Sequence, residues 1–383
     1  MHALAAAKGL APLVETLRDR FDRDRSLPPE LVAALRDMGL FRMWVPRALG
    51  GAELDPITFL TVIEELSRLD GSLGWCAVIP AGYARLSGAL DESVARTIFD
   101  CGTLVGSLNP TGKAVMVPGG FQVSGRWTYG SFIGHGDWVL GNCLTQDATA
   151  PLKAEDGGPV FRLCLFPRGA VEVFDIWHVG GLRATGSNDY QVTDLFVPES
   201  YTIPLPGFQP PPRQPGPLYS VPMTSTFVSC IATVALGIAR GAIDALIGIA
   251  ASKVTGGTSV PLRDKPLAQA ELAKAEALVR SGRAFLFDEL STMWIDAQAD
   301  RAIGMEARAG VRLAAMQATQ NAIQAVDTMY RLAGGAALFE SGRLERCLRD
   351  VHAAGQHLAV SPLSNLEPIG RVLFGLPPGL ARF

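Results

Sequence analysis

The sequence has 383 residues, of which 48% are hydrophobic and 19% are charged, and its formal net charge is -3 at pH 7. This length allows two or three packed domains, and the composition is globular rather than disordered or fibrous. The slightly negative charge and the lack of any Lys/Arg block give no basis for binding nucleic acid or an anionic membrane.

The six cysteines are spread along the chain without a C-x-x-C pair, which is typical of free thiols in a reducing compartment. The first twenty residues lack the basic and apolar regions of a signal peptide. We therefore expect a cytoplasmic protein. Residues 228–251 are apolar enough to suggest a membrane span, but Arg240 and Asp244 interrupt them. This segment is predicted to be a buried core helix without membrane contact.

Residues 1–103 are predicted to form an N-terminal helical domain. Phe59, Ile63 and Leu66 recur at helical spacing, and glycine-containing breaks separate several short helices. Residues 104–205 differ, because short apolar runs such as 115–117, 138–140 and 161–166 alternate with turns that contain Pro and Gly. This pattern predicts a central antiparallel β-barrel or sandwich.

Eight prolines lie within residues 203–222, a density that neither a helix nor a central strand tolerates. Residues 206–222 are therefore predicted to be an extended connector. Residues 223–383 contain no proline between Pro266 and Pro362 and are rich in Ala, Leu, Arg and Glu, which favours a C-terminal four-helix bundle. The expected fold class is α+β.

The residues do not predict a metal site. His352 and His357 differ by five positions, so on a helix they point about 140° apart and cannot share a metal as an i, i+4 pair can. No dinucleotide-binding glycine motif, zinc-protease motif or nucleophile elbow occurs. Redox or group-transfer chemistry would therefore need an organic cofactor.

Three segments resemble signatures of the acyl-CoA dehydrogenase superfamily. The first is GRWTYGS (residues 125–131) with its continuation to residue 138, the second is GLRATGSNDYQVTDLFVPES (181–200), and the third is residues 330–360, with a double glycine followed by Arg-Asp. Together they span most of the chain in the family's order. The resemblance implies the three-part fold of that superfamily, a flavin cofactor and a homotetramer.

The same resemblance implies which residues contact the flavin. The cofactor-binding residues that it suggests are Asn109, Trp127, Thr128, Tyr129, Ser131, Arg183, Thr185, Ser187, Gly334 and Gly335. On the residues alone, Trp127 as a core anchor and Ser131 as a turn residue are the simpler interpretation. Gly334 and Gly335 are compatible either with a phosphate, often one bound by a neighbouring subunit in the family, or with the end of a helix.

The chain departs from the dehydrogenase pattern at the catalytic base. A dehydrogenase needs a carboxylate to remove the proton next to the thioester carbonyl. In the common branch that glutamate follows the Arg-Asp pair by about eight residues, where this chain has Gln356, His357 and Leu358 and no acid until Glu367. The other known location corresponds to residues 223–231, MTSTFVSCI, which also contain no carboxylate.

His357 stands close to the place of the missing base, a pattern that resembles the two-component flavin monooxygenases. This branch implies reduced FMN or FAD supplied by a separate reductase, and O2 that reacts to a C4a-hydroperoxide. The expected activity is hydroxylation of a small aromatic or natural-product substrate. The expected catalytic residues are His357, which hydrogen-bonds or deprotonates the substrate, and Ser131, which hydrogen-bonds flavin N5.

Three alternatives stay open at this point. The first is an FAD-dependent dehydrogenase or oxidase that acts on an acyl thioester or a nitroalkane. The second is an N-oxygenase of a nucleotide-linked amino sugar, and the third is a scaffold that binds no flavin. The sequence does not distinguish FMN from FAD, and it does not identify the substrate.

Overall fold

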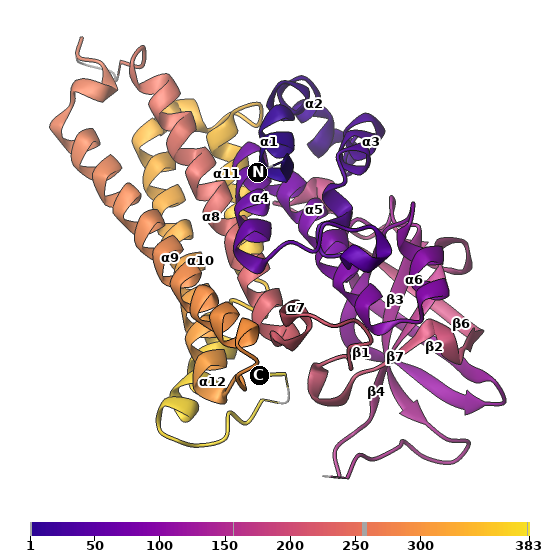
Figure 1. The fold of residues 1–383 in the computed structure, drawn as a ribbon. Coiled ribbons are helices and arrows are strands. Elements are labelled where there is room, and N and C mark those ends of the chain that lie inside the picture. The colour runs from indigo at the N-terminus through magenta and orange to yellow at the C-terminus, as the bar shows by residue number, and fades with distance from the viewer. Residues whose placement is uncertain (1, 156, 255–258, 381) are drawn as a thin grey trace.

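A computed structural model describes residues 2–155, 157–254, 259–380 and 382–383. The N-terminal region consists of the helices α1 (His2–Gly9), α2 (Ala11–Asp24), α3 (Pro29–Asp37), α4 (Pro56–Leu69), α5 (Gly71–Tyr83) and α6 (Glu92–Phe99). In Figure 1 this region lies between a β-sheet and a bundle of long C-terminal helices. The chain is thus an α+β protein with the helical, β and helical order that its sequence predicts.

Helix α5 is the central element of the fold. Its N-terminus forms at Asp70, whose carboxylate accepts hydrogen bonds from the backbone N–H groups of Ser72 and Leu73 and so satisfies two donors that a helix start leaves free. Nearly all of its side chains are buried. It packs against α4, α8, α11 and β1, so that it contacts all three parts of the chain.

The strands are β1 (Leu104–Val117), β2 (Gly120–Gly130), β3 (Trp138–Gln146), β4 (Phe161–Pro167), β5 (Glu172–Phe174), β6 (Asn188–Pro198) and β7 (Thr202–Pro204). Within the described residues they form one sheet in the order β5-β6-β2-β1-β3-β4-β7. The purely antiparallel prediction was wrong, because β1 and β3 pair in parallel. The β1–β2 hairpin places β2 on one side of β1, and residues 131–137 then return the chain to the other side.

The C-terminal region begins with α7 (Pro217–Ser220) and continues with α8 (Met223–Ala250), α9 (Pro266–Gln298), α10 (Met305–Ala333), α11 (Arg343–Gly355) and α12 (Pro362–Leu373). Helices α8 to α11 pack as a bundle around α10, as Figure 1 shows on the side away from the sheet. The proline-rich residues before α7 connect the sheet to this bundle.

Helix α8 is the apolar segment that resembles a membrane span. Among the described residues it is the one helix that is long and apolar enough to cross a membrane. However, 78% of its most apolar 18-residue stretch is buried inside the fold. Its two charged residues are paired within the protein: Arg240 contacts Asp244 and Glu276, and Asp244 also contacts Arg68 of α4. Helix α8 is therefore a core helix of a soluble protein.

Candidate active site

A row of buried hydroxyl groups joins α5 to the loop between β5 and β6. Trp75 on α5 donates its indole N–H to Ser131 Oγ at 3.1 Å. Ser131 Oγ lies 2.8 Å from Ser187 Oγ, which lies 2.7 Å from Thr185 Oγ1. Thr185 Oγ1 in turn donates to the carbonyl of Leu182 at 2.8 Å. The predicted site residue Ser131 is thus brought together with two others, Thr185 and Ser187, that lie more than 50 positions away in sequence.

The hydrogen-bond partners fix the direction of this row. A hydroxyl group has one proton to donate and two lone pairs that accept. Thr185 gives its proton to a carbonyl, so it accepts from Ser187, and Ser187 accepts from Ser131. Ser131 Oγ therefore keeps one lone pair for a further donor, while its own proton is already bound.

The ring of Trp75 also connects this row to His357. The two rings lie 5.7 Å apart between centroids, and the Phe227 ring of α8 meets His357 edge-on at 5.5 Å. His357 lies in the turn that follows α11, where its Nδ1 accepts a hydrogen bond from the backbone N–H of Ala359 at 3.1 Å. An accepting Nδ1 carries no proton, so the neutral ring carries its proton on Nε2.

Burial lowers the pKa of His357 to about 4, because a charged imidazole loses its hydration between apolar rings. The side chain is consequently neutral throughout the physiological range of pH. Its Nε2–H is a hydrogen-bond donor, whereas its basic nitrogen is already occupied by the backbone. The geometry therefore equips His357 to donate a hydrogen bond rather than to remove a proton.

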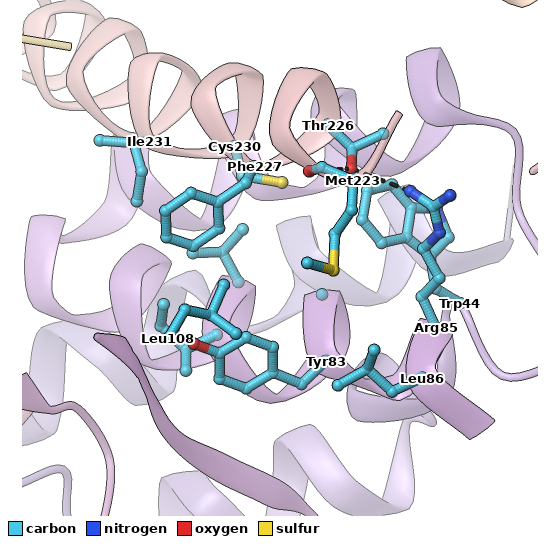
Figure 2. A pocket seen from close by; sticks show the side chains of 13 residues that line it. Trp44, Tyr83, Arg85, Leu86, Leu108, Met223, Thr226, Phe227, Cys230 and Ile231 are labelled. Carbon is cyan, nitrogen blue, oxygen red and sulfur yellow. Dashed lines mark hydrogen bonds between the residues drawn. The ribbon is translucent and has the colours of Figure 1, made fainter. Parts of the chain in front are cut away.

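A mostly apolar chamber lies beside this cluster, shown in Figure 2. Its empty volume is about 470 Å³, part of which is open to solvent. Its walls come from four parts of the fold: Trp44 before α4, Val78, Ile79, Gly82, Tyr83, Arg85 and Leu86 on α5 and the 3-10 helix after it, Leu108 on β1, and Met223, Thr226, Phe227, Cys230 and Ile231 on α8. Phe227 links the chamber to His357.

The groups around the hydroxyl row fit the polar edge of a flavin. A flavin ring presents both N–H donors and carbonyl acceptors. Ser131 offers a free lone pair, and among the described residues Arg183 Nε is buried without a partner. Asn109 donates only a long hydrogen bond, 3.4 Å, to Thr128 Oγ1, and both residues are half-buried. These groups thus have hydrogen-bonding capacity that the protein itself does not use, and a bound flavin could use it.

Two buried side chains, Asp350 and Asp70, connect the elements that surround the site. Asp350 on α11 accepts a hydrogen bond from the backbone N–H of Leu182 at 2.6 Å. Asp70, the residue that caps α5, lies beside it and contacts Arg346 at 3.3 Å. Burial, together with the charge of Asp70, raises the pKa of Asp350. One cluster thus positions α5, α11 and the Leu182 loop relative to one another.

The comparisons with known proteins agree with this arrangement. The family model "Acyl-CoA dehydrogenase, N-terminal domain" matches residues 4–85, and "Acyl-CoA dehydrogenase, C-terminal domain" matches residues 229–362. The indole-3-acetate monooxygenase of Pseudomonas putida is 30% identical over 98% of this chain and 96% of its own. The chain belongs to the acyl-CoA dehydrogenase family.

Two further relatives indicate the branch of the family. The oxygenase component of an FADH(2)-dependent resorcinol hydroxylase from a Rhizobium species is 28% identical over 97% of this chain and 93% of its own. The crystal structure of a 3-HSA hydroxylase from Rhodococcus sp. RHA1 superimposes with a TM-score of 0.92 at 25% identity, covering 100% and 99% of the two chains. The chain is a flavin-dependent monooxygenase, an oxidoreductase of this family.

Trp127 occupies a different place from the one that the family resemblance implies. Its ring is fully buried inside the sheet and stacks on Tyr190 at 5.4 Å. A Cβ atom added at Gly112 or Gly141 would lie 2.2 or 2.4 Å from this ring, so these positions are tight enough to require glycine. Trp127 is a core residue without an exposed face, and we leave it out of the proposed flavin wall.

Three other predicted contacts lie at the surface. Tyr129 has a positive φ of 62° and is 62% exposed, with its ring edge-on to Trp177. Gly334 ends α10 with a φ of 55°, and both Gly334 and Gly335 are exposed. Among the described residues, no hydrogen bond joins these glycines to Ser131 or His357. Their role toward a cofactor stays a prediction.

The chamber contains no candidate for the base of a dehydrogenase. None of the residues that line it is an aspartate or a glutamate. Met223, Phe227 and Ile231 line it from α8, within the segment 223–231 where the family resemblance implies the second location of a base. On the α11 side, neutral His357 is the titratable group that contacts Phe227.

Three residues of this site were not predicted from the sequence. Nothing in the sequence analysis distinguishes Trp75, and Phe227 belongs there only to a stretch without carboxylates, although each contacts His357. Arg85 was not singled out at all. Its signal was available, because it is the one charged residue between positions 71 and 90, and a lone charge in an apolar segment marks a buried polar contact.

Proposed function

We propose that this chain is the oxygenase component of a two-component monooxygenase that uses reduced flavin and O2 to hydroxylate a small aromatic substrate. The observation that supports this most strongly is the apolar chamber without a carboxylate, adjoining a neutral histidine and a buried hydroxyl row. Its walls of aromatic and aliphatic side chains suit a flat, apolar ring. The names of the relatives, which hydroxylate or oxygenate aromatic compounds, agree with this proposal.

Reduced flavin, when bound, supplies the electrons that activate O2. The residues that would hold it are Ser131, Ser187, Thr185 and Arg183, with Asn109 and Thr128 at one side. Ser131 would accept a hydrogen bond from an N–H group at the edge of the bound flavin, N5–H above all, since its own proton is bound by Ser187. The apolar chamber excludes water from the reacting atoms.

His357 orients the substrate. Its Nε2–H donates a hydrogen bond to an oxygen or another acceptor of the substrate, while the Ala359 N–H holds the ring from the other side. Trp75 and Phe227 contact the imidazole and fix its plane. Of the two roles predicted for His357, hydrogen bonding is the one that we retain, because Nδ1 is already occupied.

The same proposal includes a cofactor, a partner protein and an oligomeric state. A separate flavin reductase supplies the reduced flavin, and FAD is the preferred form because the Rhizobium relative is FADH(2)-dependent. The protein acts in the cytoplasm as a homotetramer. Apolar side chains exposed on and after α12, among them Leu363 at 98%, Leu373 at 69% and Phe374 at 86%, support association between copies.

A coupled assay tests this function. The purified chain would be combined with NADH, FAD and a flavin reductase, and a panel of phenols, indoles and arylacetic acids would be screened for hydroxylated product and for H2O2. We expect product from at least one ring class, and only H2O2 when no aromatic compound is added. Reduction of bound FAD by an acyl-CoA, without any hydroxylated product across the panel, would contradict the proposal.

A further inference from the structure

Arg85 is a buried cation beside the chamber. It follows α5 in the 3-10 helix Ala84–Ala89, lines the chamber and is only 6% exposed. Among the residues that the structure describes, it forms no ion pair. Burial and the charge of Glu53 raise the pKa of the neighbouring Tyr219, but Glu53 does not pair with Arg85. Its carboxylate accepts a hydrogen bond from the backbone N–H of Arg47. Burial lowers the pKa of Arg85 to about 10, so it stays charged at neutral pH.

The hydrogen bonds of Arg85 are made to neutral acceptors. Its guanidinium donates to Thr226 Oγ1 at 3.1 Å and to the carbonyl groups of Tyr219 and Val221. These three bonds leave two of its five N–H groups without a partner among the described residues. Neutral acceptors also leave a full positive charge uncompensated in an apolar environment, which is costly.

The surroundings of Arg85 place this charge where a ligand can reach it. The chamber and a smaller hollow under the proline-rich connector share Arg85, Leu86 and Met223 in their walls. In Figure 2 the guanidinium points toward Thr226, and Arg85 and the Phe227 ring lie on opposite sides of the Met223 side chain. Tyr219 lines the smaller hollow, and its hydroxyl is buried without a partner in the described part of the chain.

We propose that Arg85 binds an anionic group, a carboxylate above all, on the aromatic substrate whose ring fills the chamber. This inference rests on the proposed function, because it assumes that the chamber holds the substrate. The ring lies toward Phe227 and His357, and the acidic group lies toward Arg85. A carboxylate supplies the missing negative charge and accepts hydrogen bonds from the two free N–H groups of Arg85. Arg85 is therefore a specificity residue that selects aromatic acids over neutral analogues.

Matched ligand pairs test this inference without altering the protein. Phenylacetate and phenylacetamide, 4-hydroxyphenylacetate and its amide, and indole-3-acetate and its amide have the same shape but differ in charge. Their affinity would be measured by calorimetry at pH 7, with and without FAD. We expect at least one acid to bind about tenfold to hundredfold more tightly than its amide. Equal affinity within every pair, or binding of none of the six compounds, would overturn the inference.

Two variants assign the preference to the residue. Arg85→Gln should lower the affinity for the acid about tenfold or more and change that for the amide less than about threefold. Arg85→Lys, which keeps the charge and protects against a failure to fold, should retain part of the preference. Arg312 is the matched control, since it is also 6% exposed and donates only to neutral acceptors, but lies outside the chamber. Arg312→Gln should leave the acid-to-amide ratio unchanged.

These outcomes are separate from those of the proposed function. Hydroxylation of neutral phenols with no preference for acids would sustain the monooxygenase and refute the role of Arg85. An acid preference that persists in Arg85→Gln would also refute it. Preferential binding of acids by a chain that hydroxylates none of the panel would instead count against the proposed function alone.

Discussion

At the scale of single residues, the direction of the hydroxyl row determines what Ser131 can do. Its proton is bound by Ser187, so it meets a ligand as an acceptor. Replacement by alanine leaves the Trp75 indole N–H without a partner, which costs about 1–3 kcal/mol of unfolding free energy. We expect Ser131→Ala to raise the share of O2 released as H2O2 on the order of tenfold, measured against product formed.

Thr319→Val is the control for this variant. Thr319 is also fully buried and donates only to the carbonyl of Ala315 within α10. Its replacement should lower stability by a similar amount and leave the ratio of H2O2 to product unchanged. If both variants released H2O2 to the same extent, the effect would come from a looser fold and not from the hydroxyl group of Ser131.

His357 makes stability depend on pH in a defined direction. Its pKa in the folded protein, about 4, lies below the ordinary value of 6.5. Between these two values the unfolded chain binds a proton that the folded chain does not, so stability falls as the pH drops from 6.5 toward 4. We expect wild type to lose at most roughly 1.4 kcal/mol per pH unit relative to His357→Gln over this window. Urea unfolding at pH 4.5, 5.5 and 7 measures the difference, and parallel curves would contradict the assignment.

At the scale of elements, the Asp350 contact holds α11 against the Leu182 loop. The raised pKa means that this side chain is protonated in the fold at a pH where the unfolded chain has lost the proton. Its stabilising contribution is therefore present below about pH 4 and is lost as the pH rises toward the raised pKa. Asp350→Asn resembles the protonated form and keeps an acceptor for the Leu182 N–H.

We expect wild type to lose stability relative to Asp350→Asn as the pH rises from 5 to 8, by roughly 1.4 kcal/mol per unit until the raised pKa is passed. The midpoint of urea unfolding at the two pH values measures this. Asp37→Asn, which changes an exposed carboxylate at the end of α3, is the control and should show no such trend. A constant difference between wild type and Asp350→Asn would show that Asp350 is ionised in the fold.

Trp127 tests whether the sheet core and the cofactor site are separate. Trp127→Phe removes the hydrogen bond to the Asn142 carbonyl and part of a buried ring, so we expect a loss of about 2–4 kcal/mol in unfolding free energy. The affinity for FAD, measured at low temperature where the variant is folded, should stay within about twofold of wild type. A tenfold weaker affinity in a folded variant would return Trp127 to the flavin wall.

The sequence predicted local features of these elements better than their pairing. The core position of Phe59, Ile63 and Leu66 follows from spacing within one helix, and all three are buried. The parallel pairing of β1 with β3 depends on the path of residues 131–137 across the sheet, which apolar alternation does not specify. For the same reason the pattern around Trp127 did not reveal on which side of the sheet its ring lies.

At the scale of the whole molecule, the site exists only where three regions meet. Trp75 comes from the N-terminal helices, Ser131 and Ser187 from the β-region, and Phe227 and His357 from the C-terminal bundle. The sequence indicated Ser131, Ser187 and His357 through a family resemblance. It did not indicate that Trp75 connects them, because Trp75 and Ser131 are more than 50 positions apart. It also did not indicate Arg85, because Arg85 lines a chamber whose walls come from several segments.

We propose above all that this assembled site transfers one oxygen atom from O2 to an aromatic ring. A single turnover with 18O2, reduced FAD and the best substrate of the coupled assay tests it most directly, with product and H2O2 measured by mass spectrometry and peroxidase assay. We expect one 18O atom in the product of wild type, and we expect a His357→Phe variant to consume O2 while most of it leaves as H2O2. Product that carries oxygen from water, or an oxidised product without added oxygen, would contradict it.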